Sequence, residues 1–294
     1  MKKFSKSFLK LNILIILLIL YLFNSTLVIT SILNYTNLFI TKLMPVVFII
    51  YVFSSLLIDQ GIINYLSIIF KNKATIIYVI LISLIGGFPS GAKTTKEVLT
   101  KNYIDIDTAN YLIRFTHFSN PLFILGSLKS LFNNNYPILI LISLITSNFI
   151  IAFIYKKRTN TLELLTTKEI PFSKSLSNSI INSLKILINI YGTSIFFILI
   201  LEIINHYFKL PIIYYVLISG IFDLTKGSFS TSLISNNIVR AILIIIFNSL
   251  GSIPIHIQTK SIISDTEISY KNFFISRIMQ LSISIVIFLF FTIF

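Results

Sequence analysis

The stretch Ile85-Gly86-Gly87-Phe88-Pro89-Ser90-Gly91-Ala92-Lys93-Thr94-Thr95 decides how this chain folds. It follows an uncharged run from Ala74, which is about 18 Å long if helical, against roughly 30 Å for the core of a bilayer. Three glycines and a proline within six residues cannot continue that helix. Backbone groups freed at this depth are tolerated only where protein buries them or where they line a wet cavity. The sequence therefore predicts a helix that breaks inside the membrane, with a tight loop at the membrane surface as the open alternative.

The composition is that of a membrane protein. Hydrophobic residues make up 55% of the 294 residues, charged residues only 12%, and the mean hydropathy is +0.90. The apolar runs are continuous instead of alternating, which favours helices over a β-barrel, and an open sheet would leave its edge without partners in lipid. We therefore expect an all-α polytopic membrane protein.

The charged and reactive residues exclude several function classes. The net charge is +14, but the lysines stand at the ends of apolar segments, where they set topology and meet lipid headgroups, so no nucleic-acid partner is expected. There is no cysteine, and the three histidines are scattered, so no metal site is expected. No Ser-Lys, Gly-x-Ser-x-Gly or paired-acid constellation indicates an enzyme.

The spacing of the apolar runs predicts the order of the spans. Four lysines within the first ten residues precede a first helix near residues 9–30, which places the N-terminus in the cytoplasm. Asp107 is expected to cap a helix over residues 108–118. Lys156-Lys157-Arg158 is a strong cytoplasmic stop after a membrane span. The other expected spans are residues 38–58, 137–155, 184–206 and 278–294.

Four polar breaks divide the chain into two similar halves. Residues 1–158 carry the Gly-Gly-Phe-Pro-Ser-Gly-Ala-Lys and Asn-Pro breaks, residues 159–179 form a cytoplasmic linker, and residues 180–294 carry the Phe-Asp-Leu-Thr-Lys-Gly and Gly-Ser-Ile-Pro-Ile-His-Ile-Gln breaks. Short interrupted apolar segments in corresponding positions of two halves are typical of secondary transporters. The sequence thus predicts two inverted repeats with re-entrant hairpins or broken helices.

The polar residues at these breaks form the candidate substrate site, because amides at a helix start together with hydroxyls and a lysine can hold an anion. Lys93 is the first candidate for a ligand contact, with snorkelling to the headgroups as its alternative. Asp223 is expected to pair with Lys226 or Arg240, or to carry a coupling proton. The candidate site residues are Gly87, Pro89, Ser90, Gly91, Lys93, Thr94, Ser119, Asn120, Asp223, Thr225, Ser228 and Gln258.

The breaks also resemble the signature stretches of a known family, the YlbJ-type (SpoVV-type) sporulation integral membrane proteins. The resemblance covers roughly residues 35–294 and rests on Gly87 to Lys93, Asn120 to Ile124 with Gly126, Gly220 to Asp223 with Gly227, and Gly251 to Gln258. The family belongs to the nucleoside-recognition (Gate domain) superfamily, so the resemblance implies a fold like that of concentrative nucleoside transporters. Two departures are Asp223, where the family usually has Glu, and Ser252, which replaces the second residue of a Gly-Gly pair.

The resemblance implies secondary transport of dipicolinic acid across the mother-cell (outer forespore) membrane of a spore-forming bacterium during endospore formation, by alternating access. Dipicolinate is a small planar dianion, which suits polar breaks with helix N-terminal amides. Phe88, Phe118 and Phe222 are candidates for stacking on its ring. The expected partners are accordingly this small anionic substrate and the lipid bilayer.

Other functions stay open at this point. The chain is alternatively a carrier of nucleosides or of another small metabolite, or a non-transporting membrane scaffold for spore assembly. The sequence identifies no cofactor, and it does not decide between H⁺ and Na⁺ as coupling ion. The direction of transport and a homo-oligomeric state are likewise open.

Overall fold

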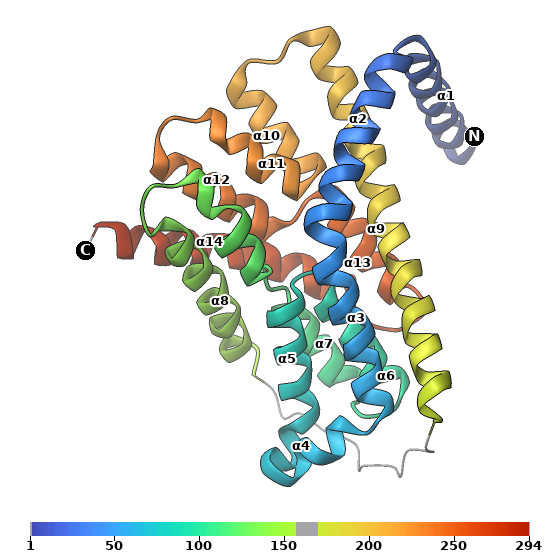
Figure 1. Ribbon diagram of the computed structural model, residues 1–294, viewed down its shortest axis with the longest axis vertical. Coiled ribbons are helices and arrows are strands. Elements are labelled where there is room, and N and C mark those ends of the chain that lie inside the picture. Colours follow the sequence, from blue (N-terminus) through green and yellow to red (C-terminus); the bar gives the residue numbers. More distant parts are fainter. Residues whose placement is uncertain (1, 157–169, 294) are drawn as a thin grey trace.

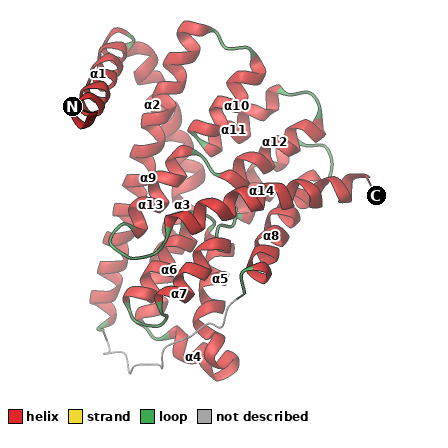
Figure 2. Ribbon diagram, turned by 180° about the vertical axis from the view of Figure 1, so that it is seen from behind, coloured by secondary structure: helices red, strands yellow, loops and turns green. Residues whose placement is uncertain are grey.

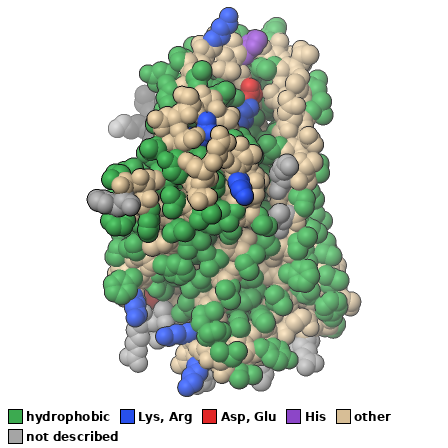
Figure 3. All heavy atoms as spheres, turned by 60° about the vertical axis from the view of Figure 1, so that its left-hand side comes forward, with side chains coloured by type: hydrophobic (Ala, Val, Ile, Leu, Met, Phe, Trp, Pro, Cys, Tyr) green, Lys and Arg blue, Asp and Glu red, His purple; other side chains and the backbone are tan. Residues whose placement is uncertain are grey.

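The computed structural model describes residues 2–156 and 170–293, and nearly all of these residues lie in helices (Figure 1). Within this part of the chain five helices are long and apolar enough to cross a membrane, or six if the bent pair at residues 8–41 counts as one span. Figure 3 shows a broad hydrophobic area over the lower half of one face, with Lys and Arg side chains beneath it. The fold is therefore all-helical, as predicted, and is consistent with a polytopic membrane protein.

The first half of the chain opens with α1 (Lys2–Phe23), which meets α2 at a bend of 93°. A π-helical turn, Phe39–Leu43, joins α2 to α3, so these two helices run on as one long element. The helices after α1 are α2 (Ser25–Leu38), α3 (Met44–Asp59), α4 (Ile62–Phe70), α5 (Ala74–Gly86), α6 (Ser90–Thr100), α7 (Ile106–Phe115) and α8 (Tyr136–Ile154).

The second half opens with the longest helix, α9 (Phe172–Phe208), which runs through most of the height of the molecule in Figure 1. The helices after it are α10 (Ile212–Phe222), α11 (Leu224–Ser230), α12 (Asn237–Leu250), α13 (Ile253–Ile263) and α14 (Tyr270–Ile293). Short 3₁₀ or π turns connect some of these helices and those of the first half, namely Lys71–Lys73, Phe123–Ser127, Lys129–Leu131 and Thr231–Leu233.

Both halves place their elements in the same order: a long helix, a helical hairpin broken at its tip, a broken helix and a closing helix. The long helices pack together, α3 and α2 on α9, and the closing helices α8 and α14 pack on each other. Figures 1 and 2 show the hairpin α5–α6 in the lower half of the molecule and the hairpin α10–α11 in the upper half. The inverted relation between the two halves stays a prediction.

Three predicted helix boundaries in the first half are wrong. The span predicted near residues 9–30 is interrupted at Asn24, where the chain turns sharply between α1 and α2. Helix α7 is capped by Asp105 instead of Asp107, because the Asp105 carboxylate accepts a hydrogen bond of 2.8 Å from the backbone N–H of Thr108. The same helix ends at Phe115, before the predicted residue 118.

In the second half two helices begin earlier than predicted. Helix α9 starts at Phe172, so residues 172–179 are helical, whereas residues 159–169 of the predicted linker lie outside the described part of the chain. Helix α14 starts at Tyr270 instead of residue 278. Arg277, which stands just before the predicted span of residues 278–294, is therefore inside a membrane-length helix and is fully buried.

The first two breaks pack directly against each other through glycines. Gly87 has φ +67°, and a Cβ atom built there would lie 2.8 Å from the backbone N of Asn120. A Cβ atom on Gly91 would lie 2.0 Å from the carbonyl oxygen of Thr116. Side chains larger than hydrogen are excluded at both positions, so the hairpin α5–α6 lies backbone to backbone on the segment that follows α7.

The carbonyl groups freed at the second break receive donors from α8 and α14. The Arg277 guanidinium donates to the carbonyl oxygen of Arg114 at 2.5 Å and to that of His117 at 3.4 Å. The Asn148 side-chain amide also donates to the His117 carbonyl, at 2.8 Å. In an apolar medium such as a membrane, each carbonyl group without a donor would cost roughly several kcal/mol. These donors therefore allow the helix to be interrupted after α7. The break is thus built from three distant segments of the chain.

We expect Gly91→Ala to destabilise the protein, because the added methyl group collides with the Thr116 carbonyl. The measurement is the thermal unfolding midpoint of the detergent-purified protein. The control is Gly192→Ala in α9, where no atom lies within 4 Å of the built Cβ. There alanine should be neutral or stabilise the helix by up to about 1 kcal/mol. Equal unfolding midpoints for the two variants would contradict the packing described above.

We expect Arg277→Met to lower the free energy of unfolding by about 1–3 kcal/mol for each carbonyl that loses its donor. Lys271→Met on the same helix removes a cation that is exposed, so it serves as the control. Thermal unfolding in detergent measures both. If Arg277→Met unfolded at the same temperature as Lys271→Met, Arg277 would not hold the break together.

Candidate functional site

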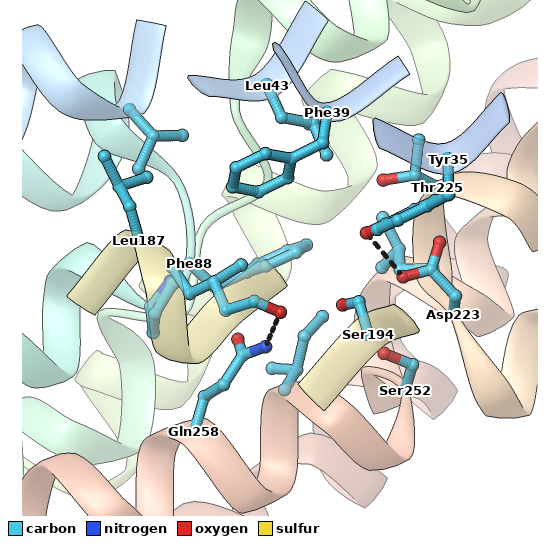
Figure 4. A pocket seen from close by; sticks show the side chains of 15 residues that line it. Tyr35, Phe39, Leu43, Phe88, Leu187, Ser194, Asp223, Thr225, Ser252 and Gln258 are labelled. Atoms are coloured by element: carbon cyan, nitrogen blue, oxygen red, sulfur yellow. Dashed lines mark hydrogen bonds between the residues drawn. The ribbon is translucent and has the colours of Figure 1, made fainter. Parts of the chain in front are cut away.

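A cavity of about 80 Å³ lies where three of the four breaks meet the two long helices (Figure 4). A second cavity of about 150 Å³ adjoins it and reaches the remaining break at Asn120. Five residues line both cavities and form the boundary between them, namely Leu43, Val47, Phe88, Leu224 and Thr225. The side chains that line the first cavity are Tyr35, Phe39, Leu43, Val47, Phe88, Pro89, Leu187, Ile190, Ser194, Asp223, Leu224, Thr225, Ser252, Ile255 and Gln258.

Asp223 is the acidic group of this cavity. It lies at the tip of the hairpin α10–α11 in an extended conformation, which ends α10, and its carboxylate caps α11 by accepting the Lys226 backbone N–H at 2.8 Å. The Tyr35 hydroxyl donates to the second carboxylate oxygen at 3.3 Å, as Figure 4 shows, and the Ser194 hydroxyl also bonds to the carboxylate. The side chain is 4% exposed. Asp223 is thus held by neutral donors from two long helices and from its own hairpin.

The cations predicted to pair with Asp223 have other partners. The Lys226 ammonium forms an ion pair with Glu202 of α9. The Arg240 guanidinium donates to three backbone carbonyl groups, those of Leu131, Thr231 and Ile234. Since both cations are engaged elsewhere, the predicted ion pair with Asp223 is not formed.

Gln258, Ser252 and Phe88 supply the other functional groups of the cavity wall. The Gln258 amide donates to the Thr193 hydroxyl at 2.9 Å. The Ser252 hydroxyl is buried and has no hydrogen-bond partner among the described residues, so it is free to bind a polar ligand. The ring of Phe88 stacks on that of His117, with a centroid distance of 4.5 Å. Of the three phenylalanines predicted to stack on a substrate, only Phe88 lines this cavity in the described part of the chain.

Lys93 lies apart from both cavities. Its ammonium donates to the Ser55 hydroxyl at 2.6 Å and to the Tyr51 carbonyl at 3.1 Å, and it faces the Glu97 carboxylate at 3.5 Å. The side chain is 7% exposed, so it does not snorkel to the headgroups either. Lys93 therefore joins α6 to α3, and any role as a direct ligand contact stays a prediction.

The remaining predicted site residues do not all lie at the cavities. Pro89 and Thr225 line the first cavity, and Asn120 lines the second. Gly87 and Gly91 pack on the second break, and the Ser90 hydroxyl bonds to the Gly87 carbonyl. Three buried hydroxyl groups have no partner among the described residues and line neither cavity, namely those of Thr94, Ser119 and Ser228.

Tyr35 and Ser194 were not predicted as site residues. Tyr35 lies near the end of α2, among Asn34, Thr36 and Asn37, and Ser194 lies inside the long helix α9. Neither stands at one of the four breaks or next to a charge, so no signal in the sequence marks them. They reach the cavity because α2 packs along α9, and this arrangement cannot be read from either segment alone.

The lining of the cavity combines polar and apolar groups. Within residues 2–156 and 170–293 no group of three His, Cys, Asp or Glu side chains is placed to hold a metal ion. None of the described residues that line the cavity is Lys or Arg. The site thus offers hydroxyl and amide hydrogen bonds, one carboxylate and an aromatic face.

Comparison with known proteins gives one relative and no structural neighbour. The sporulation integral membrane protein YlbJ of Bacillus subtilis (strain 168) is 24% identical over 244 aligned residues, which cover 68% of this chain. The chain spans only 60% of the length of that relative. No family model and no solved structure matches the chain. The similarity supports the YlbJ-type family indicated by the four breaks, and the wider nucleoside-recognition superfamily stays a prediction.

Proposed function

We propose that this protein is a secondary transporter that carries dipicolinic acid, a small planar aromatic dicarboxylate, across the mother-cell membrane during endospore formation. The observation that carries the proposal is the cavity at which three helix breaks meet two long helices. Interrupted helices around a cavity at membrane depth are how secondary transporters build substrate sites. The name of the Bacillus relative supports the link to sporulation.

The cavity offers a complementary surface for such a ligand. The hydroxyl groups of Tyr35, Thr225 and Ser252 and the amide of Gln258 are hydrogen-bond donors, and carboxylate oxygens accept such bonds. Phe88 provides an aromatic face on the same wall. Substrate carboxylates would replace the present protein contacts of these donors. Recognition of this kind rests on hydrogen bonds and stacking.

The size of the cavity agrees with a transporter in a closed state. About 80 Å³ is small beside the several hundred Å³ that a drug-sized ligand fills. Loading then requires that one of the hairpins, α5–α6 or α10–α11, moves away from the long helices. Two hairpins that approach the site from opposite halves of the molecule suit alternating access, as in transporters built from inverted repeats.

A second candidate is a carrier of nucleosides or another small neutral metabolite. It is favoured by the absence of Lys and Arg from the described cavity lining and by the Asp223 carboxylate, which accepts hydrogen bonds from hydroxyl or amino groups. Such a substrate needs no neutralising charge. Competition between nucleosides and dipicolinate for uptake separates the two candidates.

The test is uptake of radiolabelled dipicolinate by proteoliposomes that contain the purified protein. We expect saturable uptake, and we expect Gln258→Leu to raise the KM about tenfold or more, because a hydrogen bond to a charged group contributes roughly 1.5–3 kcal/mol. Gln60→Leu is the matched control, since Gln60 is exposed at the end of α3.

An unchanged KM in Gln258→Leu would show that Gln258 does not bind the substrate. Absence of dipicolinate uptake by folded protein, together with uptake of nucleosides, would establish the second candidate. Absence of uptake of both would leave the scaffold function, in which a partner protein should co-purify.

A further inference from the structure

The carboxylate of Asp223 is the unusual group of the cavity, because it is buried at a membrane-deep hairpin tip and contacts only neutral donors among the described residues. These donors are the hydroxyls of Tyr35 and Ser194 and the backbone N–H of Lys226. A buried carboxylate of this kind is stable as an anion only while its donors stay in place, whereas the protonated form is neutral and costs less to bury.

The charged and titratable groups on the surrounding elements do not neutralise it. The Lys226 ammonium bonds to Glu202, the Arg240 guanidinium to backbone carbonyls, and the His256 ring to the Leu250 carbonyl and the Tyr270 hydroxyl. The titratable groups on the elements around Asp223 are Tyr35 on α2, Lys174, Lys185, Tyr191, Glu202, His206 and Tyr207 on α9, Tyr214 and Tyr215 on α10, Lys226 on α11, Arg240 on α12, and His256 and Lys260 on α13.

An anionic substrate cannot share this cavity with an ionised Asp223 at low cost. The lining of the cavity is mostly apolar, so like charges placed a few ångströms apart in it repel strongly. Adding one proton to Asp223 removes the repulsion, and the resulting O–H group becomes a donor for a substrate carboxylate. Protonation and anion binding therefore favour each other.

We propose that Asp223 is the coupling site of the transporter: it takes up one proton from water when the anion binds and releases it to water on the opposite side of the membrane. This inference rests on the proposed function and deepens it, since it names the coupling ion and the residue that binds it. For a dianion, one proton per cycle leaves a net charge of −1 to be moved.

A third cavity, of about 420 Å³, lies next to Asp223 and is lined by Tyr35 together with Asn34, Glu202, Lys226 and Ser230. Tyr35 lines both this cavity and the 80 Å³ cavity, and its hydroxyl group bonds to Asp223. One side chain thus separates the third cavity from the carboxyl group, and we assign the third cavity as the route of the proton. In Figure 4 the Tyr35 hydroxyl points at Asp223.

The test measures proton uptake on dipicolinate binding, with the purified protein in weakly buffered detergent solution that contains a pH indicator. It is run where dipicolinate is fully ionised. We expect one proton taken up per dipicolinate bound by the natural protein, and none by Asp223→Asn, whatever the affinity of that variant. Asp265→Asn is the matched control, because Asp265 is exposed and bonds to Lys96 outside the cavity, and it should keep the uptake of one proton.

A second variant keeps the test decisive if Asp223→Asn does not fold. Tyr35→Phe removes a donor that stabilises the ionised carboxylate, so the pH above which dipicolinate affinity falls should move upwards. Binding without proton uptake by the natural protein, uptake of a full proton by Asp223→Asn, or an unchanged pH profile in Tyr35→Phe would overturn the coupling site. Failure of the natural protein to bind dipicolinate at any pH is a different result, and it would overturn the proposed function together with this inference.

Discussion

The structure depends on satisfying the backbone groups that are freed where helices break within apolar stretches of the chain. At the second break this is done by the Arg277 guanidinium, which reaches the carbonyl groups of Arg114 and His117 from the closing helix of the other half. A buried cation in a membrane protein is expensive unless donors and acceptors are matched, and here backbone carbonyls supply the acceptors. One side chain thereby ties the two halves together at the site where the chain is least regular.

The other breaks solve the same problem locally. Asp223 caps α11 with its own carboxylate, and the His256 ring bonds to the last carbonyl of α12. Each of these contacts joins residues that are close in the sequence, so it depends only on the hairpin or helix that contains both partners. The second break is different, since its donors come from Asn148 and Arg277 on α8 and α14. The second break is therefore tied to distant segments, whereas the contacts of Asp223 and His256 with their own breaks are local.

The charged groups differ in the partners that they have. The buried Arg277 guanidinium bonds to backbone carbonyl groups. The Lys226 ammonium forms an ion pair with the Glu202 carboxylate. Asp223 is left with neutral donors beside the cavity. A site with one carboxylate and several hydroxyl groups can exchange a proton without moving a salt bridge. That property links the proposed substrate chemistry to the proposed coupling ion.

The sequence by itself determined the membrane class, the helical content and the position of each break. Glycine, proline and polar residues inside apolar runs act locally, so Gly87 and Asp223 could be recognised without knowledge of any neighbour. Only the tertiary structure decided which polar groups meet. Lys93 bonds to α3, and Tyr35 and Ser194 line the cavity. These contacts depend on how distant helices pack, which the sequence alone does not show. The burial of Arg277 could not be predicted for the same reason, since its acceptors lie about half the chain away.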